Sequence, residues 1–310
     1  MHITGKQSTL QKALHFFLTK MILAIGVIVA LVAIMEWLRS FLLDRTNLSN
    51  DVKDITIAVA EACIATAGYI IFFRAYEKRR IHEMSSAKLS NNAIIGFLTG
   101  IILQSLFILI IYLNGTFLVA NVNPFSILIS PFAFALTAGF VAEIILIGIV
   151  FRLLEEQTGT AIALIIFIIL FALLHVNAKG ATFISVGATA MQAGFMLPAA
   201  YVFSRSLWLP IFLHLGWDFA EPGIFGAINS STSISQGLIT SKISGPVLLT
   251  GGQNGPQSSV QALIFCLLTG IIFLILAKQK NNLVKINWRS NATNKSSAAN
   301  GADNREHQYL

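Results

Sequence analysis

Four ionisable residues, Glu143, His175, His214 and Asp218, lie in or beside the apolar runs of the region from Ala138 to Asp218. Each lies in or beside a run of residues long and apolar enough to cross a lipid bilayer. An ionisable side chain at membrane depth costs free energy, so its presence there is by default evidence for a functional site. We therefore expect the four side chains to share one polar pocket between neighbouring helices.

The spacing of these residues limits the chemistry. On a helix, residues four apart share a face, which pairs Phe171 with His175 and His214 with Asp218. Glu143 and two imidazoles can polarise a water molecule for hydrolysis, or they can bind a divalent metal such as zinc through His175, His214 and Glu143. Spacing alone does not choose between a metal site and a metal-free acid–base site. The alternative is a set of polar residues that hold the helices together by hydrogen bonds.

Composition predicts a membrane protein. The 310-residue chain is 55% hydrophobic and 11% charged, with a mean hydropathy of +0.74, whereas an average soluble domain is about 25% charged. Its formal net charge of +7 lies mostly in segments that flank apolar runs, which favours topology signals over nucleic-acid binding. Cys63 and Cys266 lie within apolar runs and are interpreted as packing residues. We expect the lipid bilayer and a membrane-associated peptide or protein as partners, and no nucleic acid.

The apolar runs predict an all-α polytopic fold of about eight transmembrane helices around a polar intramembrane cavity. We expect a cytoplasmic N-terminus at 1–16, a membrane domain at 17–277 with its core at about 127–220, and a disordered tail at 278–310. Residues 114–125 are predicted to form an uncharged loop. The expected spans are Phe17–Leu43, Ile55–Phe73, Ala93–Leu113, Ile127–Glu156, Ala161–His175, Ile184–Phe203, Leu207–Phe219 and Val260–Leu276.

Basic residues favour one side of this topology. The even-numbered loops and the C-terminal tail carry more Lys and Arg than the odd-numbered loops. The positive-inside rule therefore predicts cytoplasmic termini and, for a bacterial protein, location in the inner membrane. The basic segment 74–80 is interpreted as a topology anchor or lipid-headgroup contact, and Glu155 and Glu156 as solvated acids at the membrane interface.

Three short motifs in this region resemble those of the CPBP family of intramembrane proteases, which includes the type II CAAX prenyl endopeptidases and the bacterial abortive-infection proteins. The F-x-x-x-H motif matches Phe171 to His175, and the H-x-x-x-N/D motif matches His214 to Asp218. The order and spacing of these motifs on membrane spans fit the family. The resemblance implies that His175 assists activation of a water molecule and that His214 and Asp218 stabilise the oxyanion.

The first family motif, E-E-x-x-x-R, is degenerate here. In the natural alignment Ala142 replaces the first Glu, Glu143 is retained, and Ile147 replaces the Arg. In the family the first Glu is thought to activate the attacking water, so the resemblance implies that the usual general base is missing. Glu143 is rotated by about 100° from position 142 on a regular helix, and Glu61 is another intramembrane carboxylate that could substitute.

Three functions remain open on the sequence. The first is an intramembrane endopeptidase with Glu143, His175, His214 and Asp218 as catalytic residues. The second is a catalytically inactive family member that binds peptides or partner proteins, for example in immunity or regulation. The third is a transporter or channel, which the lack of visible internal repeats makes the weakest of the three.

Overall fold

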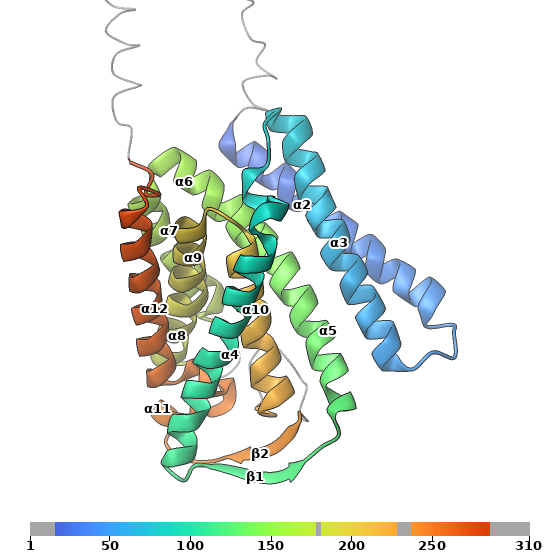
Figure 1. Cartoon of the computed structure of the whole chain (residues 1–310), viewed down its shortest axis with the longest axis vertical. Helices are drawn as coiled ribbons and strands as arrows, with labels where there is room; N and C mark the ends of the chain where they lie inside the picture. Colours follow the sequence, from blue (N-terminus) through green and yellow to red (C-terminus); the bar gives the residue numbers. More distant parts are fainter. Residues whose placement is uncertain (1–15, 178–180, 228–236, 286–310) are drawn as a thin grey trace, which may run out of the picture.

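The chain folds as a bundle of roughly parallel and antiparallel helices with a small two-stranded sheet at one end (Figure 1). This computed structural model describes residues 16–177, 181–227 and 237–285. The predicted N-terminal segment and most of the predicted tail therefore lie outside the described residues. The all-α polytopic fold is confirmed.

The first half of the bundle contains three long helices and one composite helix. These are α2 (Phe17–Leu38, continued by a π-helical turn at Arg39–Leu43), α3 (Asn50–Glu77), α4 (Leu89–Leu113), and α5 (Ile129–Thr137), which continues through π-helical segments at Ala138–Ala142 and Ile144–Phe151 into α6 (Arg152–Thr158).

The second half contains shorter helices. These are α7 (Thr160–His175), α8 (Phe183–Met191), a π-helical turn at Gln192–Met196 that leads into α9 (Leu197–Ser204), α10 (Trp208–Phe219) with a π-helical continuation at Ala220–Ile224, α11 (Val247–Thr250) and α12 (Val260–Gln279).

All eight predicted spans are helical, but they differ in length. Six helical segments in the described part of the chain are long and apolar enough to cross a membrane, whereas α7 is shorter. The 16 residues of α7 extend about 24 Å, less than the roughly 30 Å hydrocarbon core. The last residue of α7, His175, is half-buried.

The predicted loop at 114–125 contains a strand, which the sequence reading missed. Strand β1 (Phe117–Val122) pairs antiparallel with β2 (Ile239–Ile243), with an irregularity between Val119 and Asn121. The strand was missed because its partner lies more than a hundred residues away and gives no local signal. The sheet connects the ends of helices that carry the site (Figure 1).

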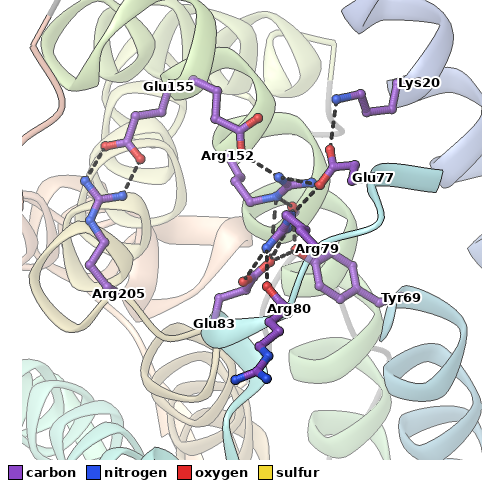
Figure 2. Close-up of polar contacts among 11 residues, drawn as sticks. Lys20, Tyr69, Glu77, Arg79, Arg80, Glu83, Arg152, Glu155 and Arg205 are labelled. Atoms are coloured by element: carbon purple, nitrogen blue, oxygen red, sulfur yellow. Dashed lines mark hydrogen bonds and ion pairs between the residues drawn. The ribbon is translucent and has the colours of Figure 1, made fainter. Parts of the chain in front are cut away.

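An ion-pair network links helix termini at the other end of the bundle (Figure 2). Glu77 pairs with Lys20 at 2.8 Å and with Arg152 at 3.4 Å, and Arg79 pairs with Glu83 at 2.6 Å. Burial opposes the charge on Glu83, but hydrogen bonds from Arg79 outweigh it and keep the pKa of Glu83 below its ordinary value. The start of α2 and the end of α3 therefore share one end of the bundle.

Two expectations about charges are corrected by this network. Glu155 is not a solvated acid, because it is 2% exposed and forms two bonds with Arg205, at 2.5 and 2.9 Å. Arg79, within the basic segment 74–80, is a structural member of the network rather than only a topology anchor. Glu155 was misread because its partner, Arg205, is 50 residues away in the sequence.

Glycines set the distance between α4 and α10. A Cβ added at Gly100 would lie 2.3 Å from the carbonyl oxygen of Leu213, and one at Gly216 would lie 2.2 Å from the carbonyl oxygen of Phe97. These are backbone atoms, which cannot move aside as a flexible side chain can. The close approach of α4 and α10 therefore requires glycine at these positions.

We predict that Gly216→Ala lowers the stability of the protein by about 1–3 kcal/mol or more, because the added methyl group must push two helix backbones apart. The measurement is the thermal unfolding midpoint in detergent. Gly26→Ala is the matched control, because a Cβ there meets nothing within 4 Å. Equal midpoints for the two variants would contradict the predicted packing.

Candidate active site

A cavity of about 280 Å³ lies between the helices that carry the predicted site residues. Its wall combines mostly apolar side chains with a few polar groups, the usual character of a small-molecule or peptide site. Residues from α7, α10 and the composite helix α5–α6 contribute. The lining is Ala142, Leu146, Phe171, Leu174, His175, Thr189, Gln192, Ala193, Met196, Leu197, Leu213, His214, Trp217, Asp218 and Gln257.

His214 lies between two carboxyl groups. Its Nδ1 is 2.8 Å from Oε1 of Glu143, and its Nε2 is 3.3 Å from Oδ2 of Asp218. The second contact follows from the predicted spacing of four residues on α10, whereas the first joins two helices. Both contacts are hydrogen bonds only when both ring nitrogens carry hydrogen or when a carboxyl group carries the proton. The three groups therefore share protons as one unit.

Ala142 and Glu143 face different surroundings, as the sequence predicts. Ala142 lines the cavity, whereas Glu143 is 1% exposed and directs Oε1 at His214. The helix around them is π-helical on both sides of Glu143, a wide-turn geometry that occurs frequently at functional sites. Position 142, where the family motif has its first Glu, is therefore a cavity position occupied by a methyl group.

His175 lines the same cavity from α7. Its Nδ1 is 2.9 Å from the carbonyl oxygen of Phe171, and its ring stacks on that of Phe171 at 5.1 Å between centroids. A carbonyl oxygen only accepts, so Nδ1 must donate. In a neutral imidazole the other nitrogen, Nε2, then carries the lone pair. The contact therefore orients His175 as a proton acceptor through Nε2.

The second oxygen of Glu143, Oε2, is buried and has no hydrogen-bond partner within the described residues. Such an unsatisfied group costs about 1–3 kcal/mol. Ile147, which replaces the family's Arg, lies four residues later and is 1% exposed. A residue four positions later on the helix lies on the same face as Glu143, and the apolar side chain of Ile147 cannot donate a hydrogen bond to Oε2.

The side chains do not form the metal site that the sequence left open at His175, His214 and Glu143. The described part of the chain has no group of three or more His, Cys, Asp or Glu residues placed to hold a metal ion. Both nitrogens of His214 already face carboxyl oxygens, and Nδ1 of His175 faces the Phe171 carbonyl. The donor set as placed therefore does not fit a metal.

Two other buried charged residues, Glu61 and Arg152, do not line the cavity. Glu61 accepts a hydrogen bond of 2.8 Å from Thr137, which joins α3 to α5. Glu61 therefore joins two helices and does not line the cavity. Arg152 belongs to the ion network of Figure 2, away from the cavity lining.

Sequence reasoning missed three polar residues beside the cavity. Gln192 lines the cavity and donates to the carbonyl oxygen of Gln257, and Glu221 is 0% exposed and accepts from the backbone N–H of Gln257 at 3.1 Å. These contacts hold the segment before α12 against the cavity. Glu221, three residues after Asp218, was readable as an intramembrane acid, but the predicted span ended at Phe219.

The comparison with protein families now adds an independent finding. Residues 123–220, which contain Glu143, His175, His214 and Asp218, match the family model described as "Type II CAAX prenyl endopeptidase Rce1-like". Neither the curated proteins nor the solved structures gave a match. Residues 123–220 of this integral membrane protein are therefore similar to the CAAX protease family.

Proposed function

We propose that this protein is an endopeptidase of the CAAX type that hydrolyses a peptide bond in its intramembrane cavity. The observation that carries this proposal is the convergence of His175, His214 and Asp218 on one cavity inside the family-matched region. These residues come from two helices, and a purely structural set of polar residues need not line an open space.

His175 is the proposed general base. The hydrogen bond from Nδ1 to the Phe171 carbonyl leaves Nε2 to accept a proton from a water molecule in the cavity. The resulting hydroxide attacks the carbonyl carbon of the substrate peptide bond. In this proposal His175 takes over the role of the carboxylate that position 142 lacks.

His214 is the proposed oxyanion donor. Glu143 holds Nδ1 at 2.8 Å, whereas the contact between Nε2 and Asp218 is 3.3 Å, longer than the usual 2.9–3.0 Å of an N–H···O bond. A substrate oxyanion can compete for Nε2–H at that distance. Glu143 is then a positioning residue that orients the ring and balances its charge.

The proton that His175 accepts is returned to the leaving amine as the tetrahedral intermediate collapses. The products are one carboxylic acid and one amine, and both histidines regain their starting protonation states. The acid then passes its proton to the amine or to solvent water. No step requires a group other than the chain's own side chains and water.

The cavity lining indicates the kind of substrate. No Lys or Arg lines the cavity in the part of the chain that the structure describes, and Asp218 is its only carboxylate there. Leu146, Leu174, Met196 and Trp217 supply apolar contact surface. We therefore expect an uncharged, largely apolar peptide segment as the substrate.

One observation favours a second function. Ala142 lines the cavity at the position where the family has a carboxylate, and a methyl group accepts no proton. A member that has lost hydrolysis but keeps the cavity would bind a membrane peptide or protein without cleaving it. The two functions differ in whether His175, without a carboxylate at position 142, is sufficient as the base for peptide hydrolysis.

We predict that the purified protein in lipid nanodiscs cleaves apolar membrane peptides from a broad peptide library. His175→Ala is expected to lower the cleavage rate by about 10²–10⁴-fold, the usual contribution of a general base. His82→Ala is the control, because His82 is exposed and outside the cavity. Cleavage that survives in His175→Ala would exclude this histidine as the base.

A second prediction concerns position 142. Because Ala142 faces the cavity, Ala142→Glu is expected to raise the cleavage rate by at least about tenfold, as a second base near the water. Adding Ile147→Arg is expected to raise it further by pairing with Oε2 of Glu143. Ala142→Gln matches Glu in size but accepts no proton at neutral pH, so an equal gain from Gln would reject the acid–base explanation.

If the wild type is silent and Ala142→Glu cleaves, the second function holds for the native protein and the cavity still binds peptide. If Ala142→Glu is also silent, a direct test is photocrosslinking of an apolar peptide to the cavity. Labelling near Trp217 that decreases when unlabelled peptide is added supports peptide binding. If no labelling occurs near Trp217, both proposed functions of the cavity are rejected.

We also propose that the charged end of the bundle faces the cytoplasm of a bacterial cell, with both termini on that side. Ion pairs place the start of α2, the ends of α3 and α9, and the chain after α12 at this end. Basic residues concentrate there, as the positive-inside rule requires.

In a Cys63→Ala background, we predict that Ser86→Cys resists a membrane-impermeant maleimide in intact cells and that Asn47→Cys reacts. Both positions are exposed and lie at opposite ends of the long helices. Both should react after permeabilisation, which controls for accessibility. The reverse labelling pattern would invert the orientation.

A further inference from the structure

A second cavity lies at the charged end of the bundle, distant from the candidate active site. It has a volume of about 360 Å³ and opens between the start of α4 and the ends of α9 and α12. Its polar lining comes from Lys88, Asn91, Asn92, Arg205, Lys280 and Asn282. We call it the basic cavity.

The basic cavity has an excess of positive charge. No carboxylate lines it in the part of the chain that the structure describes. Arg205 is neutralised by Glu155, but Lys88 and Lys280 form no ion pair among residues 16–177, 181–227 and 237–285. The N-terminus of the 25-residue helix α4 adds the positive end of a helix dipole.

Lys88 and Lys280 contact uncharged groups, backbone carbonyl oxygens and an aromatic ring, which do not neutralise their positive charge. The Nζ of Lys88 lies 3.3 Å and 3.4 Å from the carbonyl oxygens of Ser204 and Arg205, and the Nζ of Lys280 lies 4.2 Å from the centre of the Phe203 ring. Both ammonium groups belong to residues that line the cavity, Lys88 directly before α4 and Lys280 directly after α12. An anion between them would supply the missing counter-charge.

An apolar stripe leads away from the basic cavity along α4. Ile95 lines the cavity and is 42% exposed, and Leu98 and Ile102 continue at intervals of three and four residues with exposures of 50% and 55%. Residues at these intervals share one helix face. On a membrane-spanning helix, an exposed apolar face contacts lipid chains.

We propose that the basic cavity is a binding site for the phosphate headgroup of an anionic phospholipid, held by Lys88 and Lys280, with its acyl chain along Ile95, Leu98 and Ile102. A free phosphate would satisfy the cations but not use the apolar stripe. Anionic lipids attract basic residues at the cytoplasmic membrane surface, where this end of the bundle is proposed to lie. The bound lipid would connect α4, which packs against the α10 helix of the active site, to α9 and α12.

The test is native mass spectrometry of the full-length protein in detergent, titrated with dioleoyl phosphatidylglycerol. We expect Lys88→Gln with Lys280→Gln to weaken binding of this lipid by about tenfold or more, since each lysine near a phosphate contributes a charge contact. Lys278→Gln with Lys285→Gln is the matched control, because both residues are exposed at the same end and outside the cavity. Equal binding by the two double variants would overturn the proposal.

A second pair of variants tests the apolar part of the site. Ile95→Asn should weaken phosphatidylglycerol binding several-fold, whereas Ile94→Asn should not, because Ile94 is 60% exposed and does not line the cavity. Phosphatidylcholine and inorganic phosphate serve as separate competitors. Displacement of the lipid by millimolar inorganic phosphate would identify a free-anion site instead, and displacement by phosphatidylcholine would show that charge does not select the ligand.

Discussion

The close approach of α10 to α4 is the constraint on which the candidate site depends. Gly96, Gly100 and Gly216 remove the Cβ atoms that would otherwise collide with the opposite backbone. With α10 held at this distance from α4, Nδ1 of His214 on α10 lies 2.8 Å from Oε1 of Glu143 on the composite helix α5–α6. A shift of 1 Å would lengthen that contact beyond a useful hydrogen bond. The packing of small residues in the bundle therefore sets the electrostatics of its polar centre.

The two buried polar regions differ in how completely their carboxylates are paired. At the charged end, Glu77, Glu83 and Glu155 each have an arginine partner, so these ion pairs fix the helix ends. At the candidate site, Glu143 keeps one buried oxygen without a partner, and a cavity borders the histidines. Full pairing is typical of a structural network, whereas partial pairing beside a cavity leaves polar groups available to a ligand.

The sequence predicted what is local and missed what is long-range. The spacing of His214 and Asp218 was sufficient to predict their contact, and apolar runs predicted the helices. Glu143, the other partner of His214, lies 71 residues earlier in the chain. The sequence indicated this contact only through the location of both residues within apolar spans. Glu155 was misread as solvated because its partner, Arg205, is 50 residues away. The π-helical turns around Glu143 depend on packing, and no residue pattern indicated them.

The burial of Glu143 argues that the site is more than a leftover of the fold. Among the carboxylates in the described residues, Glu143 alone has a fully buried oxygen without a hydrogen-bond partner, and such a group lowers stability by about 1–3 kcal/mol. A leucine at this position would avoid that cost in an apolar helix and would leave His214 with Asp218. A carboxylate whose hydrogen bond within the described residues is to His214 is therefore explained by control of that imidazole's orientation and charge. That control matters if His214 must donate a hydrogen bond into the cavity, to a transition state in a peptidase or to a bound peptide carbonyl in an inactive relative.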